Sequence, residues 1–459
     1  MEEAIEKTDN LENQSVFNSA RAKAVRILSR FERSDSYIDK LLDKELKYNN
    51  LNQMDKALLT ELVNGVVRWK LKLDWALVGF YIGDFLKCLN VVKNAMRVGL
   101  YQIMFLDRIP PPVAINESVE LVKRIQGEKI ASIVNGVLRN ILRNMDAIRY
   151  PNKDGELAYY YSVIYSHPKW MVKRWLRFFS EEDTEKLLIE NNKRPYVSLR
   201  VNLLNISLDK LVKYLEEDVL RYQFSNYHDN SLMLLNPRTN ITQTEMFKNG
   251  WVTVQDPSAS LAVRLASPKP GDKVLDLCSA PGGKAFYLAE LMKDEGKVVA
   301  VDTYLIKLNN IIEGAQRLNL KSIEVRQDDA LTVDYQEQFD LVFLDVPCSG
   351  LGTLSKKPDI KWKREVEDVF NLAKKQRMIL LNGAKHIKPG GVLVYSTCTI
   401  EPEENEENIA WFLDKFPEFQ LDPAQNHLPE SVCKDGFMRT YPHIHGIDGA
   451  FAARLVRNA

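Results

Sequence analysis

The sequence predicts an α/β protein whose C-terminal half is a doubly wound parallel sheet, preceded by an all-helical region and a small α+β region. Apolar residues recur at helical spacing from about Ser15 to Asn144, as in VFNSARAKAVRILSRF. After Trp251, short apolar runs typical of strands alternate with helical segments. The chain has 459 residues, too many for one ordinary hydrophobic core, so we expect two or three domains.

The order of these patterns divides the chain into four expected segments. The stretch RYPNKDGE combines proline, glycine and charged residues and predicts a linker. Beyond it, VSLRVNLL and SLMLL alternate like short strands after a helical segment. The expected segments are a disordered N-terminus (1–14), an all-helical domain (15–148), a small α+β subdomain (157–250) and an α/β domain (251–459).

The α/β domain is expected to contain parallel strands with helices on both faces of the sheet. The runs that predict the strands are KVLDL, KVVAVD, IEVRQ, FDLVFLDV and GGVLVYS. The chain closes with FMRTYP and GAFAARLVR, which predict a terminal antiparallel hairpin at the sheet edge. We interpret His443 and His445, between these two runs, as alternating strand residues and expect no metal site, because no further ligands stand at metal spacing.

Composition excludes several classes of protein. The 62 Lys and Arg residues balance the 62 Asp and Glu residues, so the net charge neither demands nor excludes a polyanionic partner. Five widely spread cysteines form neither a disulfide framework nor a C-x-x-C zinc pattern, which predicts reduced thiols and a cytoplasmic location. The N-terminus is acidic and polar, and no apolar stretch approaches the ~20 residues that span a bilayer, so we expect no export or membrane segment.

Residues that follow the expected strands predict a cofactor pocket, because ligands of doubly wound sheets bind beyond the carboxyl ends of the strands. In DLCSAPGGKA, Gly282 and Gly283 allow close approach of the backbone, and a helix that begins near Lys284 offers N–H groups to an anion. The turn lacks the G-x-G-x-x-G spacing, so by itself it also fits a plain strand-to-helix connection. Asp302 stands where an acid accepts ribose hydroxyls, and Asp329 where it can accept an adenine amino group. Together these signals favour a nucleoside cofactor.

Two cysteines and an acid are expected at the same edge. The fourth strand leads to Asp345 and Cys348 in DVPCSGLGT, and the fifth leads to Cys398 in GGVLVYSTCTI. One cysteine alone would be interpreted as a packing residue, but two beside a nucleoside pocket indicate chemistry. Methyl transfer to carbon 5 of a pyrimidine needs this set: a thiolate that adds to carbon 6 makes carbon 5 nucleophilic, and a carboxyl group beside ring nitrogen 3 stabilises the charge that develops. A second cysteine then suits the release step.

These motifs resemble the 5-methylcytosine RNA methyltransferases, and within them the RsmB/Sun (Fmu) family that acts on 16S rRNA. DLCSAPGGK, DVPCSGLGTL with KPDIKW, YSTCTIEPEEN and DGAFAARL stand in that family's order. DKALLTELVNGVVR and VGLYQIMFLDRIPPPVAINESVELVK resemble its NusB-like helical domain. The resemblance covers nearly the whole chain and implies a class I (Rossmann-like) methyltransferase fold with S-adenosylmethionine as cofactor. The cofactor-binding residues that it implies are Cys278, Ser279, Ala280, Pro281, Gly282, Gly283, Lys284, Asp302, Asp329 and Asp345.

The resemblance also implies separate roles for the cysteines. Cys398 is the expected nucleophile, Cys348 is expected to assist product release, and Asp345 to stabilise the activated base, whereas DNA cytosine methyltransferases use the Pro-Cys cysteine of the fourth strand as nucleophile. The helix EENIAWFLDKF would lower the pKa of the Cys398 thiol through its dipole, but nearby glutamates oppose this effect. We interpret Cys278 as a small packing residue rather than a third catalyst. Asp328 stands where the family usually has glycine, which leaves open which acid meets the adenine.

RNA is the expected partner. The loop SKKPDIKWKR places basic residues around Trp362 and predicts phosphate contacts with base stacking, a solvated basic loop being the alternative. VKRIQGEK and LRNILRNM in the helical domain are also basic, and the resemblance to NusB implies RNA binding there. We expect 16S rRNA or a small-subunit precursor as the substrate, no membrane partner, and a monomeric protein.

Two other functions fit the sequence less well. One is a non-catalytic RNA-binding or antitermination protein with a vestigial methyltransferase domain, against which the intact set of Asp345, Cys348 and Cys398 argues. The other is a methyltransferase that acts on DNA or on a small molecule. Binding of labelled S-adenosylmethionine separates the first from the enzymes, and transfer of the label to RNA but not to DNA excludes the second.

Overall fold

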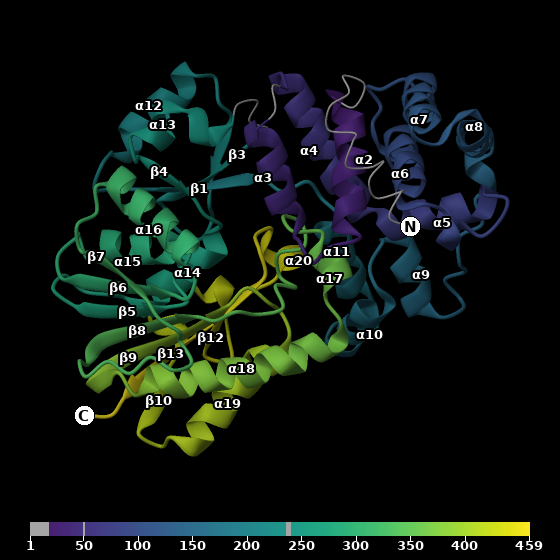
Figure 1. The fold of residues 1–459 in the computed structure, drawn as a ribbon. Helices are drawn as coiled ribbons and strands as arrows, with labels where there is room; N and C mark the ends of the chain where they lie inside the picture. The colour runs from purple at the N-terminus through teal and green to yellow at the C-terminus, as the bar shows by residue number, and fades with distance from the viewer. Residues whose placement is uncertain (1–17, 49–50, 236–239) are drawn as a thin grey trace. The chain divides into compact units, whose positions relative to one another are not determined.

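The structure is a computed structural model that describes residues 18–48, 51–235 and 240–459, so the predicted disordered segment 1–14 lies outside the described residues. The chain divides into two compact units (Figure 1). One comprises residues 1–192 together with 357–363, and the other comprises residues 193–356 and 364–459. Each unit has its own hydrophobic core.

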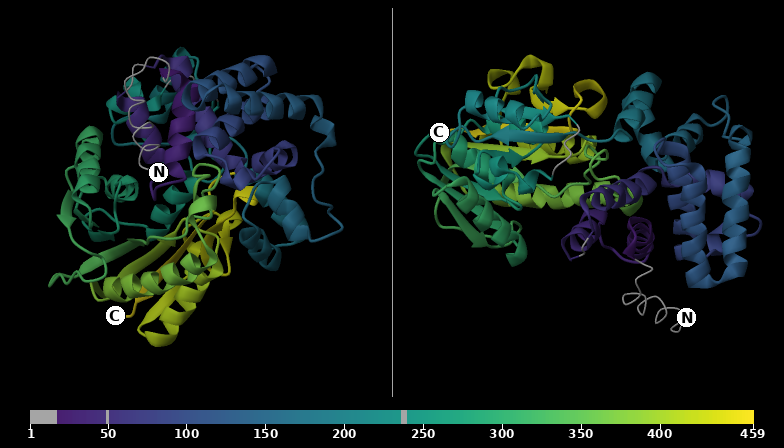
Figure 2. Two further views of the ribbon diagram at one scale, coloured as in Figure 1. Left: turned by 45° about the vertical axis from the view of Figure 1, so that its right-hand side comes forward. Right: turned by 90° about the horizontal axis from the view of Figure 1, so that it is seen from above.

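The first unit is helical in its described residues, as predicted. Helices α6, α7 and α8 lie side by side (Figures 1 and 2). The α-helices of this unit are α2 (Ala20–Phe31), α3 (Ile38–Tyr48), α4 (Gln53–Arg68), α5 (Lys70–Phe80), α6 (Asn90–Phe105), α7 (Pro111–Gln126), α8 (Glu128–Arg143), α9 (Leu157–Ile164), α10 (Lys169–Phe178), α11 (Glu181–Asn191) and α17 (Ile360–Lys363).

Local signals in the sequence explain where these helices begin and end. The Ser19 side chain accepts the Ala22 N–H at 3.2 Å and caps α2. Pro111 at the first helical position begins α7, and Gly127, with φ 85°, ends it. Along helices such as α8 the apolar side chains share one buried face, which is why helical periodicity predicted this region correctly.

The prediction that the basic loop SKKPDIKWKR forms an RNA surface is wrong for most of its side chains. Within the first unit, Lys361 is fully buried, and its Nζ donates to the Asn192 side-chain oxygen at 2.7 Å. Burial lowers the pKa of Lys361 well below its usual value. The Trp362 indole N–H donates to the Val67 carbonyl at 2.7 Å, so its ring edge is engaged as well. The number of charged residues in a segment does not show whether their side chains point into the protein or into solvent.

The same holds at the start of the loop, which belongs to the second unit. Lys356 forms ion pairs with both Asp256 and Asp448. These two carboxylates raise its pKa despite its burial, which acts in the opposite direction. Of the basic side chains in the loop, all of which the structure describes, Lys357 is the one that is exposed.

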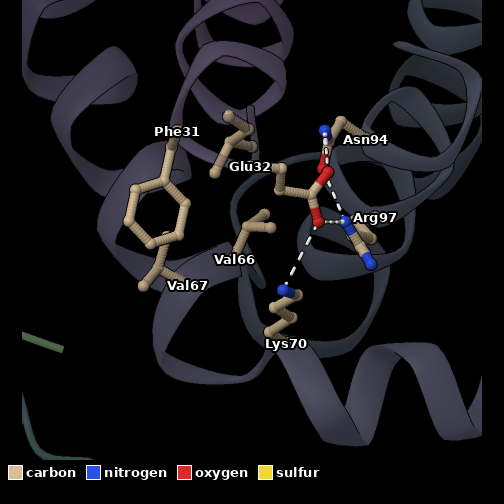
Figure 3. Close-up of a pocket in the computed structure, with 8 residues that line it drawn as sticks. Phe31, Glu32, Val66, Val67, Lys70, Asn94 and Arg97 are labelled. Atoms are coloured by element: carbon tan, nitrogen blue, oxygen red, sulfur yellow. Dashed lines mark hydrogen bonds and ion pairs between the residues drawn. The ribbon is translucent and has the colours of Figure 1, made fainter. Parts of the chain in front are cut away.

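A buried ion cluster joins α2, α5 and α6 in the first unit (Figure 3). The Arg97 guanidinium donates to both oxygens of Asp74 at 2.6 and 2.8 Å and to Glu32 at 2.6 Å. Lys70 Nζ lies 3.4 Å from the same Glu32 carboxylate, and the Asn94 amide donates to it at 3.0 Å. Most of these side chains line a small pocket between the helices. Because two cations and two anions satisfy one another there, the cluster is structural.

Arg97→Met is expected to destabilise the first unit by about 3–5 kcal/mol, because the substitution leaves two largely buried carboxylates without their main counterion. Burial alone would raise the pKa of Glu32, but Arg97 and Lys70 outweigh it and lower that pKa. Urea unfolding followed by hydrogen exchange in peptides of α6 measures the loss. The exposed pair of Arg124 with Glu120 supplies the control, since Arg124→Met should leave the midpoint nearly unchanged. Equal effects of the two substitutions would contradict this prediction.

The second unit begins with a small antiparallel sheet in the order β2-β3-β1-β4. Helices α12 (Leu208–Glu217) and α13 (Glu245–Lys248) contribute to its core. The strands are β1 (Val197–Val201), β2 (Tyr222–Phe224), β3 (Ser231–Leu234) and β4 (Val252–Val254). The alternating runs predicted β1 and β3, whereas β2 and β4 are too short to show a period. β4 lies beyond residue 250, where we expected the α/β domain to begin. Helices α9 to α11, which we expected in the small subdomain that starts at residue 157, lie in the first unit.

The large sheet follows the predicted parallel pattern in the order β9-β8-β5-β6-β7, with further strands beside β9. All neighbouring pairs within this group are parallel. The strands are β5 (Lys273–Leu277), β6 (Lys297–Asp302), β7 (Ile323–Gln327), β8 (Phe339–Asp345), β9 (Ile387–Thr397), β10 (Phe419–Asp422), β11 (Cys433–Lys434), β12 (Phe437–Thr440) and β13 (Ala450–Arg457). The predicted runs correspond to β5, β6, β7, β8 and β9.

Helices cover both faces of this sheet (Figure 1). The Val274 side chain packs in a core with α14, α15 and α16, whereas Leu275 and Leu277 pack in a second core with α18 and α19. Near-continuous apolar runs such as KVLDL predict this two-sided burial. The helices are α14 (Pro257–Ala266), α15 (Gly283–Leu291), α16 (Leu305–Leu318), α18 (Val366–Ala384) and α19 (Glu406–Lys415).

The C-terminal hairpin forms as predicted but does not end the sheet. β13 pairs with β9 on one side, while β12 and β10 share its other side. His443 and His445 lie on the short helix α20 (Pro442–His445) and not on a strand, a correction explained by Pro442 at the first helical position. Among the described residues, no group of three or more His, Cys, Asp or Glu side chains could hold a metal ion. No helix in the described ranges combines the length and apolar character needed to cross a membrane.

Candidate active site

The strand order creates the crevice in which this architecture binds ligands. β5 lies between β6 and β8 in the sheet. The chain adds β6 and β7 on one side of β5 and then adds β8 and β9 on the other side. The loops after β5 and β8 therefore diverge at the carboxyl edge of the sheet. The predicted site residues all lie at this edge: Cys278 follows β5, Asp302 ends β6, Asp329 follows β7, Asp345 ends β8 and Cys398 follows β9.

The loop after β5 is shaped for close approach of a ligand. Cys278 has a left-handed φ of 67°, and Gly282 has a φ of 104°. A Cβ atom at Gly282 would lie 2.6 Å from the Phe286 ring, so a larger residue could not occupy this position without moving that ring. Helix α15 begins at Gly283, and the first N–H groups of a helix have no partners within the helix. This loop can therefore offer backbone donors to a bound group.

A buried acid lies beneath this loop. The Asp276 side chain in β5 is fully buried, and in the described structure neither of its carboxyl oxygens has a hydrogen-bond partner of acceptable geometry. The buried Ser279 hydroxyl likewise has none of that geometry, although it lies close enough to Asp276 to act against the rise that burial causes in that carboxyl's pKa. Burial raises the pKa of Asp276 to about 7. Because buried polar groups are nearly always hydrogen-bonded in native proteins, these two groups indicate where a bound polar ligand would complete the site.

Arg200 of β1 ties the small sheet to the first turn of α15. Its fully buried guanidinium donates to the Glu290 carboxylate at 2.8 and 3.1 Å and to the Gly283 carbonyl at 3.0 Å. The guanidinium carbon also lies 4.4 Å from the centre of the Tyr287 ring. No motif surrounds Arg200, so sequence analysis missed this residue. It holds the Gly283 backbone in place at the start of the helix.

Asp302, the predicted ribose acceptor, ends β6 with a side chain that is largely buried. Its Oδ1 accepts the Tyr304 N–H at 3.2 Å, and Lys307 Nζ lies 3.7 Å from the same oxygen. The chain itself therefore orients this carboxylate before any ligand binds. Its place at the strand end agrees with the position from which such an acid meets a ribose.

The two acids that follow β7 differ in their surroundings. Asp328 accepts the Tyr335 hydroxyl at 2.7 Å. Asp329 is exposed, and its Oδ1 accepts the Leu331 N–H at 2.9 Å. Because the Asp328 carboxylate is engaged by a side chain of its own loop, this geometry favours Asp329 as the acid available to a ligand.

Lys284 and Asp345 form an ion pair between the start of α15 and the end of β8. The Ser396 hydroxyl donates to Asp345 Oδ1 at 3.1 Å, and Lys284 Nζ donates to the Ser396 hydroxyl at 3.3 Å. Since Ser396 is also the partner of Asp345 in the ladder of β8 and β9, this triad joins the ends of these two strands to the start of α15. Sequence analysis placed Lys284 in the cofactor loop but did not predict that it orients Asp345.

The two cysteines at the strand ends meet in space. The Sγ atoms of Cys348 and Cys398 are 3.2 Å apart, and the Cys398 N–H donates to Cys348 Sγ at 3.4 Å. This separation exceeds the ~2.05 Å of a disulfide bond, so the two half-buried cysteines are not joined by a disulfide. The hydrogen bond with Cys398, followed by burial, raises the pKa of Cys348 well above its usual value. Burial likewise raises the pKa of Cys278 to about 12, so that thiol stays protonated.

Behind the cysteines lies a buried hydrogen-bond network that sequence analysis missed. The Glu404 carboxylate accepts the Ser349 N–H at 2.8 Å and the Ser349 hydroxyl, and it accepts the Gln376 amide at 2.8 Å. The Ser349 and Thr399 hydroxyl oxygens lie 2.8 Å apart. Ser349 and Thr399 directly follow the two cysteines, so the network joins both loops. Glu404 stands within the motif YSTCTIEPEEN, but Gln376 lies in a helix without any motif.

Comparisons with known proteins place each part of this chain. The model of the 16S rRNA methyltransferase RsmB/F family matches residues 263–456. The NusB family model matches residues 18–143, and the model of the ferredoxin-like domain of RsmF/B-like methyltransferases matches residues 167–242. The NusB match lies within the helical unit and the RsmB/F match within the large-sheet domain, whereas the ferredoxin-like match takes in α10 and α11 of the first unit together with β1, β2 and β3.

Relatives match over almost the full length of the chain. A probable ribosomal RNA small subunit methyltransferase B of Bacillus subtilis is 37% identical, over 95% of this chain and 98% of its own. A protein of the same description from Synechocystis is 33% identical, over 95% and 99%. The crystal structure of a methyltransferase homolog protein from Pyrococcus horikoshii is 29% identical with a TM-score of 0.58, and covers 66% of this chain and 99% of its own. The chain therefore belongs to the RsmB/F family of 16S rRNA methyltransferases, with a NusB-like helical domain, a ferredoxin-like subdomain and a Rossmann-like methyltransferase domain.

Proposed function

We propose that the protein methylates carbon 5 of a cytosine in 16S rRNA, with S-adenosylmethionine as methyl donor and Cys398 as covalent nucleophile. The observation that carries this proposal is the pair of cysteines without a disulfide, whose Sγ atoms lie 3.2 Å apart at the carboxyl ends of adjacent strands, beside the ion-paired Asp345. The names of the curated relatives, small subunit rRNA methyltransferases, support the RNA substrate. Transfer of a methyl group to an already nucleophilic atom would not need a thiol pair.

The residues around the end of β5 fit S-adenosylmethionine. The backbone of the loop at Gly282 allows close approach because the residue has no Cβ, and the buried Asp276 carboxyl beside the Ser279 hydroxyl can serve a polar ligand that carries an ammonium group. Asp302 would accept the ribose hydroxyls, and Asp329 would accept the adenine amino group. The bound cofactor supplies an electrophilic methyl group. We propose residues 278–284 with these two acids and Asp345 as the cofactor-binding set.

The side chains at the ends of β8 and β9 suit covalent activation of the base. The Cys398 thiolate would add to carbon 6, and the new carbon–sulfur bond makes carbon 5 nucleophilic. Asp345, which Lys284 and Ser396 orient, would lie beside ring nitrogen 3 and stabilise the charge that develops there. After methylation a base must remove the hydrogen on carbon 5, so that the carbon–sulfur bond breaks and the thiolate leaves. Cys348, 3.2 Å from Cys398, is placed to assist this release.

We further propose that RNA is bound by the helical domain (15–148) and the small subdomain (157–250), and modified by the methyltransferase domain (251–459). The match to the NusB family and the basic segments VKRIQGEK and LRNILRNM support a role of the helical domain. The loop SKKPDIKWKR is left out of this RNA surface, because most of its charged groups are engaged inside the protein.

Bisulfite sequencing of rRNA from cells with and without this gene tests the proposed reaction. One cytosine of 16S rRNA should resist conversion when the gene is present and become convertible when it is deleted. Restoration by the intact gene, but not by a Cys398→Ala gene, would assign the modification to the thiol. Identical conversion patterns in both strains would refute 5-methylcytosine as the product.

Asp302→Ala is expected to weaken binding of S-adenosylmethionine, because it removes charge-assisted hydrogen bonds to the ribose, each worth about 1.5–3 kcal/mol. Titration calorimetry measures the change in affinity. Asp334, an exposed acid in the loop after β7, provides a matched control, since Asp334→Ala should bind the cofactor like the parent. Unchanged affinity of Asp302→Ala would remove this acid from the proposed site.

A further inference from the structure

Glu404 is a buried carboxylate without a cationic partner. It is fully buried, and its donors are the Ser349 backbone N–H, the Ser349 hydroxyl and the Gln376 amide, all of which are neutral. No Lys or Arg pairs with it among the described residues. A buried charge without a counterion is unfavourable. A glutamine at this position could accept the same N–H groups and donate to the Ser349 hydroxyl, so hydrogen bonding alone does not require an acid there.

The surrounding network fixes this carboxylate on the side of Cys348. The Gln376 amide donates both to Glu404 and, at 3.0 Å, to the Pro347 carbonyl, which directly precedes Cys348. Glu404 itself contacts Ser349, which directly follows Cys348. The Tyr395 hydroxyl donates to the Glu404 carbonyl at 2.5 Å. With its backbone and its side chain both held, the carboxylate cannot turn away from the Cys348 loop.

When the two thiols together lose one proton, one sulfur atom becomes a thiolate. Two opposing influences decide which of the two it is. The Cys398 N–H points at Cys348 Sγ at 3.4 Å, which by itself favours a thiolate on Cys348. A negative charge beside the Cys348 loop has the opposite effect. We propose that Glu404 is a positioning residue that holds the proton on Cys348, so that Cys398 is the thiolate that attacks the base. This inference rests on the proposed covalent function and explains why one of two adjacent thiols is the nucleophile.

The proposed bias depends on pH in a defined direction. Burial raises the pKa of Glu404 to about 7, and the Glu404 charge in turn contributes to the raised pKa of Cys348. Above pH 7 the carboxylate is charged and Cys348 keeps its proton; below pH 7 the charge and the bias are both lost. The other titratable or charged groups that face this network are Glu401 on the same loop, Arg377 on α18, Tyr395 on β9, and Arg364, whose guanidinium donates to the Cys348 carbonyl at 3.4 Å.

Limited alkylation tests this inference without using methylation. The full-length protein is treated with substoichiometric iodoacetamide between pH 6 and 8.5, and mass spectrometry gives the ratio of label on Cys348 to label on Cys398. In the parent, this ratio should fall as the pH rises through about 7. In Glu404→Gln it should show no such transition and should be about tenfold higher at pH 8, equivalent to one pKa unit. Glu407→Gln, an exposed neighbour, should behave like the parent.

An unchanged ratio in Glu404→Gln would overturn the inference, and so would a flat ratio across the pH range in the parent. The second measurement needs no variant and therefore does not depend on how well Glu404→Gln folds. Methylation by Cys398→Ala separates this inference from the proposed function. Activity of that variant would refute the covalent mechanism itself, whereas its inactivity together with an unchanged alkylation ratio would refute the role of Glu404 alone.

Discussion

Cys398→Ala is expected to reduce methyl transfer to 16S rRNA to background while binding of S-adenosylmethionine survives. Without this thiol no bond to carbon 6 can form, and carbon 5 stays too electron-poor to accept the methyl group. The cofactor loop is untouched, because Asp276 lies in β5 and Gly282 in the loop that follows it, whereas Cys398 follows β9. Transfer of labelled methyl groups to rRNA measures the activity, and calorimetry measures cofactor binding.

Cys348→Ala should fail in a different way. Attack and methylation remain possible, but release is impaired, so a covalent protein–RNA adduct should accumulate and survive denaturing electrophoresis. The double variant that also lacks Cys398 should show no adduct. Cys433, a half-buried thiol of the short strand β11, gives the control, and Cys433→Ala should match the parent.

The opposite outcomes have definite meanings. If Cys398→Ala traps RNA while Cys348→Ala is merely inactive, the cysteines have the order of the DNA enzymes. If neither substitution changes methylation, the two thiols are packing residues and covalent catalysis is the wrong mechanism.

Asp345→Asn is expected to lower kcat by about 10²–10³-fold, because a neutral amide cannot stabilise the charge that develops on the base. The ion pair with Lys284 is lost at the same time, so the lysine no longer has an anion to orient. Single-turnover methylation of rRNA at saturating cofactor measures the rate of the chemical step. A rate within a few fold of the parent would show that Asp345 does not act on the base.

Ser396→Ala is the matched control for this acid. It removes one hydrogen bond to Asp345 Oδ1 but keeps the carboxylate and its pairing with Lys284. Its rate should therefore fall much less than that of Asp345→Asn. Equal losses would mean that the orientation of the acid, and not its charge, carries the effect.

The parts of the fold that sequence analysis predicted are those with a local pattern. The run KVLDL became β5, and its alternating side chains fill the cores on both sheet faces, because a strand buried on both sides is apolar along its whole length. The strands β2 and β4 have three residues each, too few to show alternation. The histidines at 443 and 445 were misplaced because two residues at a spacing of two fit a short helical turn as well as a strand.

The placement of Cys348, Cys398 and Asp345 at one edge follows from the sequence itself, because residues that end parallel strands of one sheet must share its carboxyl edge. The partners that orient them were decided by the tertiary structure alone. Lys284 pairs with Asp345 across 61 positions of sequence, Ser349 binds Glu404 across 55, and Lys361 reaches Asn192 across 169. Such contacts depend on which way a side chain turns when separate elements pack. A local pattern of charge or hydrophobicity carries no information about that direction, and this is why the basic loop at Lys361 was expected at the surface and lies buried.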